Sequence, residues 1–184
     1  LPETMGSGVA IVDFDNDGDE DLIFVRGNQW PWHQYNKKPL PSLVIYLNNG
    51  EGHFSQYLSQ KLTDSFYGVG VAVADVDGNG YQDIFVTTLG KNRLYLNDGK
   101  NLLEVATKLG VAGDEANWST AASFFDADND GDLDLVVANY VQWNKDKDLE
   151  VNYQLAGIGK AYGPPSDFAP GQLEFYLNNG DGTF

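Results

Sequence analysis

The chain has 184 residues, of which 42 % are hydrophobic and 13 % aromatic, so it is long and apolar enough to bury a core. Its 27 acidic and 11 basic residues give a formal net charge of −16. This charge excludes nucleic acid as a partner, because phosphate binding needs a basic surface. The absence of cysteine excludes disulfides and thiolate metal sites, and no apolar run approaches the ~20 residues of a transmembrane helix.

Three similar segments divide the chain into repeats. They are VAIVDFDNDGDEDLIFV from Val9, VAVADVDGNGYQDIFVT from Val71 and ASFFDADNDGDLDLVVA from Ala122. A second motif follows each of them: IYLNNGEGHF, LYLNDGKNLL and FYLNNGDGTF. Self-similarity over tens of residues is typical of repeat architectures in which each repeat is one supersecondary unit.

Both halves of each repeat are predicted to be antiparallel strand pairs. Short runs rich in Val, Ile and Phe flank each aspartate-rich loop, as strands prefer. The dipeptides at 49–50, 98–99 and 179–180 are Asn-Gly or Asp-Gly, which favour hairpin turns because these turns need positive φ angles. Two hairpins give the four strands of a propeller blade. The best helical candidate, Leu102–Leu109, is better interpreted as an outer strand and a linker.

We therefore expect an all-β fold, a β-propeller fragment of three four-stranded antiparallel blades over residues 1–184. The blades are predicted at about residues 6–60, 68–107 and 119–184. Small residues such as Gly8 and Gly70 place the first strand of each blade innermost, where blades crowd the central axis. Propellers typically have at least four blades. Because the fourth strand of the third blade would begin at about Phe184, we expect a part of a larger propeller, or a ring completed by other chains.

Each aspartate-rich hairpin loop follows the pattern D-x-D-x-[D/N]-G-x-x-D. Side-chain oxygens at positions 1, 3, 5 and 9 and the backbone carbonyl at position 7 can converge on one ion, and glycine at position 6 permits the sharp turn. Ligands that are all oxygen select a hard cation, and many ligands on a flexible loop favour Ca²⁺ over Mg²⁺. The predicted ligands of about three Ca²⁺ ions are Asp13, Asp15, Asp17, Asp19 and Asp21 in the first loop, Asp75, Asp77, Asn79, Tyr81 and Asp83 in the second, and Asp126, Asp128, Asp130, Asp132 and Asp134 in the third.

Two alternatives to these calcium loops were weighed. An EF-hand is excluded, because its position-12 glutamate would fall at Phe24, Val86 and Val137 and because the flanking residues are of β type. Plain solvated turns are disfavoured by the recurrence of the pattern at three equivalent positions. About half of the acidic residues gather in these loops, where repulsion opposes folding unless a cation neutralises it. The second loop carries Asn79 in place of an aspartate and is predicted to bind most weakly.

The loops resemble those of FG-GAP/VCBS repeats, as in the integrin α-subunit propeller. The sequence is more closely similar to the ASPIC/UnbV family of cartilage acidic protein-like chains. This resemblance rests on residues 5–10, 117–121, 124–126, 137–141 and 177–184. It implies a calcium-binding propeller, often of about seven blades, that is secreted to an extracellular or periplasmic location. Millimolar extracellular calcium also suits loops of modest affinity.

Two blades are predicted to carry long insertions between their second and third strands, at 27–42 and at about 142–172, on the face opposite the aspartate loops. Aromatic side chains on loops of a rigid scaffold can anchor a partner. They can equally cap the propeller core, and the sequence leaves both interpretations open. The candidate partner-binding residues are Trp30, Trp32, Tyr35, Trp143 and Tyr162.

Catalysis is not predicted. The chain has two histidines, His33 and His53, and no GxSxG nucleophile elbow, while the loop pattern accounts for most of its paired acids. We expect a structural or protein-interaction module whose blades calcium stabilises, with an unidentified protein or glycan as partner. A glycan-binding propeller is the alternative, and a non-catalytic part of a secreted hydrolase is a weaker one.

Overall fold

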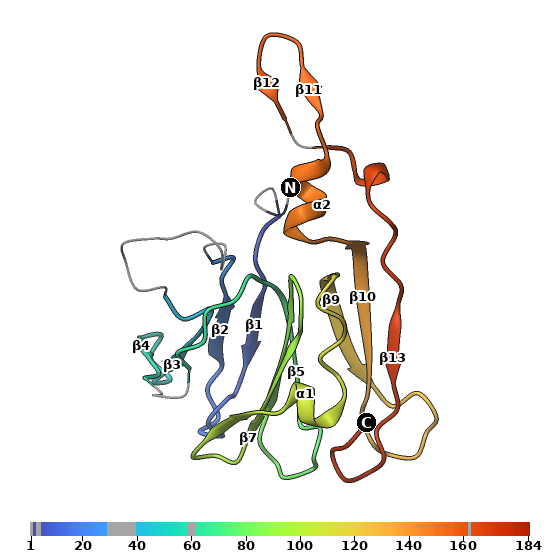
Figure 1. Ribbon diagram of the computed structural model, residues 1–184. Coiled ribbons are helices and arrows are strands. Elements are labelled where there is room, and N and C mark those ends of the chain that lie inside the picture. Colours follow the sequence, from blue (N-terminus) through green and yellow to red (C-terminus); the bar gives the residue numbers. More distant parts are fainter. Residues whose placement is uncertain (1, 3–4, 29–39, 59–61, 162) are drawn as a thin grey trace.

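The computed structural model describes residues 2, 5–28, 40–58, 62–161 and 163–184, and its regular secondary structure is mostly antiparallel β-sheet with little helix (Figure 1). Each of the three main sheets joins its strands in chain order. The first contains β1 (Val9–Val12), β2 (Asp21–Val25), β3 (Leu43–Asn48) and β4 (Phe54–Gln56). The second contains β5 (Gly68–Ala74), β6 (Asp83–Thr88), β7 (Arg93–Asn97) and β8 (Leu102–Glu104). The third contains β9 (Asn117–Phe125), β10 (Asp134–Gln142) and β13 (Glu174–Tyr176).

The predicted all-β class is confirmed, with two corrections to its details. The third sheet has three strands among the described residues, and β13 is followed by a turn in which the Asn179 N–H donates to the Thr183 carbonyl at 2.8 Å. The predicted linker after β8 contains a one-turn helix, α1 (Ala106–Leu109), which ends at Gly110 with a left-handed φ of 81°. The buried Ala106 anchors this turn against the sheets.

The first strands of the three sheets lie next to one another. A Cβ atom placed on Gly8 would be 3.0 Å from the Cα of Gly70, and one placed on Gly70 would be 2.7 Å from the carbonyl oxygen of Thr120. Backbone therefore packs directly on backbone from β1 to β5 to β9, which requires glycine at the two close approaches. This agrees with the expectation that small residues mark the crowded side of the array.

The apolar core lies between the sheets. Ile84 and Val86 of β6 pack with the first sheet, whereas Phe85 between them packs with the third. Every residue of β6 is buried, because the middle sheet has a neighbour on each face. Burial in β2 instead alternates along the strand, which is the pattern of a sheet covered on one face only.

The outward faces of the first and third sheets are apolar and exposed in this chain. Ile11 of β1 is 65 % exposed and Phe175 of β13 is 50 % exposed. A shallow cavity of about 520 Å³ lies on the outward face of the first sheet, with Phe24, Tyr46 and Phe54 in its lining. The two end sheets therefore present large hydrophobic surfaces, of the kind that normally marks an interface.

The sheets have two distinct ends (Figure 1). The connections from β1 to β2, β5 to β6 and β9 to β10 are the aspartate-rich loops, and they lie together at the lower end of the view. The connections from β2 to β3 and from β10 to β13 leave from the opposite end, as predicted. The second of these carries α2 (Lys145–Glu150), a hairpin of β11 (Gln154–Leu155) and β12 (Gly159–Lys160), and the 3₁₀ turn Pro165–Asp167. None of the described helices is long and apolar enough to cross a membrane.

Candidate metal centres

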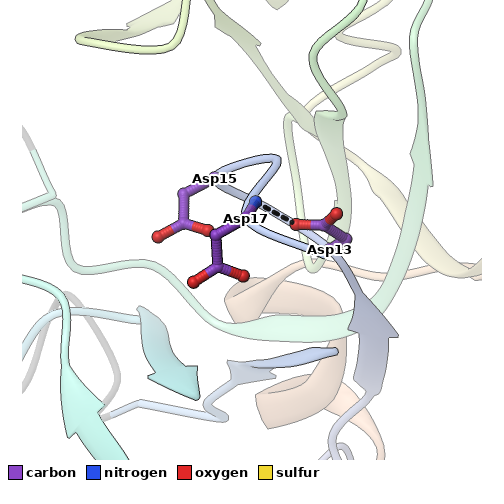
Figure 2. A group of neighbouring side chains, drawn as sticks. All are labelled: Asp13, Asp15 and Asp17. Atoms are coloured by element: carbon purple, nitrogen blue, oxygen red, sulfur yellow. Dashed lines mark hydrogen bonds between the residues drawn. The ribbon is translucent and has the colours of Figure 1, made fainter. Parts of the chain in front are cut away.

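The first aspartate of each loop accepts hydrogen bonds from backbone N–H groups later in the same loop, which holds the loop in a tight turn. Asp13 accepts the backbone N–H of Asp17 at 3.1 Å through one carboxylate oxygen (Figure 2) and the N–H of Gly18 at 3.0 Å through the other. Asp75 accepts from Asn79 at 3.0 Å and Gly80 at 2.7 Å in the same way. In the third loop Asp126 accepts from Gly131 at 3.1 Å. The same fold of the backbone thus recurs in three loops whose sequences differ.

Two positions in each loop have left-handed backbone conformations. Position 6 is the predicted glycine, with φ angles of 93°, 89° and 98° at Gly18, Gly80 and Gly131. Position 4 was not predicted: it has φ angles of 61° at Asn16 and 64° at Asn129, and glycine in the second loop. Asparagine tolerates this region better than other residues that carry a Cβ atom. The residues at position 4, which are Asn, Gly and Asn in the three loops, were therefore the signal in the sequence for a left-handed backbone conformation there.

The aspartate at position 9 is buried and ties the loop to the second motif of its repeat. Asp83 accepts from the N–H of Val76 at 2.9 Å through one oxygen and from the N–H of Asn97 at 2.8 Å through the other. Asp21 and Asp134 make the equivalent pairs of bonds, with Phe14 and Asn48 and with Ala127 and Asn178. Because each carboxylate accepts two backbone donors, position 9 has a structural role whether or not it also binds an ion.

The asparagine of the Tyr-Leu-Asn motif connects successive repeats. The Asn97 amide donates to the carbonyl of Phe14, in the loop of the preceding repeat, at 3.2 Å. The Asn178 amide donates to the carbonyl of Val76, again one repeat back, at 3.0 Å. We call this contact the inter-repeat latch. Sequence analysis missed it, although the Asn that follows Tyr-Leu in every repeat was a signal for it.

Three carboxylates converge in each loop. One ligand oxygen from each member lies within 4.8 Å of the others, close enough for all three to contact one cation. Figure 2 shows the first group, with the Asp15 and Asp17 carboxylates next to each other. The groups are Asp13, Asp15 and Asp17; Asp75, Asp77 and Asp83; and Asp126, Asp128 and Asp134. A donor set made only of carboxylates fits a hard divalent cation.

The remaining predicted ligands are arranged differently. Within the described residues, Asp21 and Asp130 lie outside these groups. Asn79 accepts the N–H of Tyr81 at 2.8 Å through its amide oxygen, a bond that Asp17 and Asp130 also make at position 5. Coordination by the backbone carbonyls at Asp19, Tyr81 and Asp132 stays a prediction.

The side chain at position 7 instead packs on the turn of the second hairpin. A Cβ atom placed on Gly99 would lie 2.4 Å from the Cζ atom of Tyr81, and one on Gly180 would lie 2.7 Å from a carboxylate oxygen of Asp132. Glycine is therefore needed in these turns for close packing as well as for its positive φ. The glycines of the Asn-Gly and Asp-Gly dipeptides are therefore explained both by the positive φ of the turn and by the packing of the position-7 side chain.

Burial, followed by the charges of neighbouring carboxylates, raises the pKa values of particular loop aspartates. Burial raises the pKa of Asp83 to about 7, although the N–H donors of Asn97 and Val76 oppose the shift. Desolvation followed by the charges of Asp17 and Asp21 raises the pKa of Asp15. A bound cation would favour the ionised carboxylates and so relieve both effects. The residues present thus fit a divalent cation electrostatically as well as sterically.

Trp143 is placed as a cap of the core. Its side chain is 4 % exposed, and it packs in a cluster with Trp118, Val141 and Phe168. The indole N–H donates to a carboxylate oxygen of Asp148 in α2 at 3.1 Å. Of the two interpretations left open by the sequence, the geometry favours capping for Trp143. The other four candidate partner-binding residues, Trp30, Trp32, Tyr35 and Tyr162, lie outside the described residues.

Comparison with known proteins agrees with the repeated geometry. The chain matches the FG-GAP-like repeat family twice, over residues 13–86 and 75–137. It is also 27 % identical over 165 residues to cartilage acidic protein 1 of Xenopus tropicalis, an alignment that covers 78 % of this chain and 24 % of that protein. The chain thus spans about a quarter of the length of this relative. Since the two family matches together cover more than half of its residues and each begins at the first aspartate of a loop, the chain belongs to the FG-GAP-like repeat family.

Proposed function

We propose that this chain forms three blades of a larger β-propeller, at about 6–60, 68–107 and 119–184, in which Ca²⁺ bound by the aspartate loops stabilises a structural and protein-interaction module. The observation that carries the proposal is that three carboxylates converge in the corresponding loop of each of the three sheets. Three loops of different sequence keep the same hydrogen bonds around these carboxylates. A common ligand explains why like charges are brought together three times.

Calcium is the cation that the donor set favours. The loops offer carboxylates, backbone carbonyls and, at Asn79, a side-chain amide, and no described His contributes to the triads. Flexible oxygen-rich loops match the irregular, high coordination of Ca²⁺ better than the strict octahedron of Mg²⁺. Loops of this kind are filled at extracellular calcium concentrations, which supports a secreted, extracellular or periplasmic protein. The second loop, with Asn79, is expected to be the weakest site.

The propeller is supported by a difference between the middle sheet, which has a packed neighbour on each face, and the two end sheets, which have one on a single face. The middle sheet is covered on both faces and is latched on both sides, through Asn97 to the first repeat and through Val76 to the third. The Asn48 amide makes its bond inside its own repeat, to the carbonyl of Glu20 at 3.2 Å. Further blades would cover the outward apolar faces and give Asn48 the partner that its equivalents have.

Calorimetric titration of Ca²⁺ into the chelated protein tests the metal assignment. About three ions should bind, and Asp77→Ala should remove one of them, because Asp77 belongs to the second triad. Asp146→Ala is the matched control, since Asp146 is an exposed aspartate of α2 at the opposite end of the sheets. An unchanged number of ions in Asp77→Ala would overturn the assignment.

A further inference from the structure

A pocket at the insertion end of the sheets gathers basic residues in a strongly acidic protein. It has a volume of about 260 Å³ and lies between the start of β5, the β6–β7 turn and the start of α2. Its lining includes Lys91, Arg93 and Lys145, which are three of the 11 basic residues of the chain. The aspartate triads lie at the other end of the sheets (Figure 1), so they do not balance this positive charge locally.

Arg93 is held in place at one side of its guanidinium group. Its Nη1 donates to the carbonyls of Lys91 at 2.7 Å and Asn92 at 3.3 Å. The guanidinium carbon lies 5.4 Å from the centroid of the Phe66 ring, which is itself buried. The Nε and Nη2 donors have no partner among the described residues. A guanidinium held by one nitrogen keeps a planar fork of donors that matches a carboxylate.

The second basic residue is weakly engaged. The Lys91 ammonium lies 3.2 Å from a carboxylate oxygen of Glu115, and the two side chains are 43 % and 80 % exposed. Exposed ion pairs of this kind contribute little free energy, so an incoming anion can share or replace the partner. The pocket therefore attracts a single negative group, whereas a long polyanion would meet the net charge of −16 on the rest of the molecule.

Polar residues such as Ser65, Thr88 and Asn144 form part of the remaining walls, and apolar side chains form the rest. Phe66, Leu89 and Trp143 line the pocket beside the cationic groups. A carboxylate next to apolar surface is the chemistry of an acidic side chain flanked by a hydrophobic residue in an extended peptide. We propose that this pocket binds such a segment of a protein partner, with the carboxylate at the free donors of Arg93 and the apolar neighbour against Leu89. This inference rests on the proposed role as an interaction module but not on calcium binding.

The test is an NMR titration of the calcium-loaded protein with acetyl-Phe-Glu-amide. Peptide addition should shift the signals of the Arg93 Nε–H and the Gly90 N–H, and acetyl-Phe-Gln-amide should bind about tenfold more weakly or worse because it lacks the charge. Arg93→Gln should weaken binding of the Glu peptide by a similar factor, and Lys91→Gln by less. The matched control is Lys100→Gln, which removes an equal charge in the β7–β8 turn and should bind as the unsubstituted protein does.

Several results would overturn the proposal. They are equal binding of the two peptides, equal weakening by Lys100→Gln, or binding of D-glucuronate in preference to the peptide, which would assign the pocket to acidic glycans. Arg93→Lys keeps the positive charge but lacks the planar fork of donors, so its affinity for the Glu peptide should lie between those of the unsubstituted protein and Arg93→Gln. This variant keeps the test valid if Arg93→Gln unfolds. Asp77→Ala should lose one Ca²⁺ ion and keep peptide binding, so failure of the calcium proposal and failure of this one give different results.

Discussion

The two ends of the sheets are built on different rules. At the aspartate-loop end, every repeat has a group of three converging carboxylates, left-handed residues at positions 4 and 6 and the same position-9 hydrogen bonds. At the insertion end, the second repeat has a short turn from Thr88 to Arg93, whereas the third has a connection from Gln142 to Glu174. This difference agrees with our proposal that the repeated end maintains the scaffold and that the unrepeated end, which is free to differ, recognises a partner.

The stabilising forces also differ between the two ends. The loop end depends on hydrogen bonds to carboxylates and, in our proposal, on cations. The insertion end depends on an apolar cluster that contains Val69, Trp118, Val141, Trp143 and Phe168. Removal of calcium and removal of an apolar side chain should therefore act on separate parts of the molecule, and their effects should add.

The largest effect is expected from Trp143→Ala. The substitution empties the site of a side chain that is 4 % exposed, and loss of a buried tryptophan typically costs about 3–5 kcal/mol. Because Trp143 packs in the apolar cluster at the end opposite the aspartate loops, urea unfolding should show the same loss with and without calcium. A loss that appears only in the presence of calcium would show that the two ends are coupled.

Asp83→Ala should be the next largest and should distinguish structural from purely ligating carboxylates. It removes the acceptor of two backbone N–H groups, of Val76 and Asn97, and should cost about 2–4 kcal/mol even without calcium. Asp77→Ala in the same loop removes an exposed carboxylate and should leave the stability of the calcium-free protein nearly unchanged. Chemical denaturation in chelator compares the two variants, and equal losses would argue against a structural role for position 9.

A smaller difference is expected between Asn97→Ala and Asn48→Ala. Both remove an amide of the Tyr-Leu-Asn motif, but of these two residues Asn97 makes the inter-repeat latch and Asn48 bonds within its own repeat. Asn97→Ala should therefore be less stable than Asn48→Ala by about 1 kcal/mol. In a chain that contains a preceding blade the difference should disappear, and thermal melts of both lengths would check it. A persistent difference would contradict the proposed position of that blade.

The smallest effect is expected from removing the hairpin of β11 and β12. The Ala161 N–H donates to the Tyr153 carbonyl at 3.0 Å, so residues 154–160 can be replaced by a Gly-Gly turn. The side chains of β11 are exposed, so the deletion should lower the free energy of unfolding by no more than about 0.5 kcal/mol. The shift in melting temperature should be correspondingly small. A larger shift would show that this hairpin belongs to the scaffold.

The sequence predicted the paired strands and the gathering of carboxylates at the loop end because the signals for both are local. Asp13, Asp15 and Asp17 lie within one short loop, so the convergence of their oxygens follows from short-range geometry. The alternation of apolar residues around it likewise predicted strands, and the pairing of β1 with β2 followed. Repetition of the pattern made each prediction stronger than any one loop would have been alone.

Features that depend on distant parts of the chain could not be predicted in the same way. The latch joins Asn97 to Phe14 and exists only once two sheets have packed. The burial of Trp143 depends on how α2 folds back over it. The N-terminus of α2 is capped by the Asn144 side chain, which accepts the N–H of Lys147, and this capping residue was a signal for the helix that the sequence analysis did not use. An aromatic residue in a long insertion is compatible with either a cap or a contact until that path is known.

Hydrogen exchange of backbone amides, with and without calcium, tests the central claim most directly, because it observes both ends in one experiment. The N–H groups of Gly18, Gly80 and Gly131, which donate to the first aspartate of each loop, should exchange much more slowly when calcium is added. The amides of α2 should exchange at the same rate in both conditions. Calcium protection of α2 with no change at the three glycines would contradict the account.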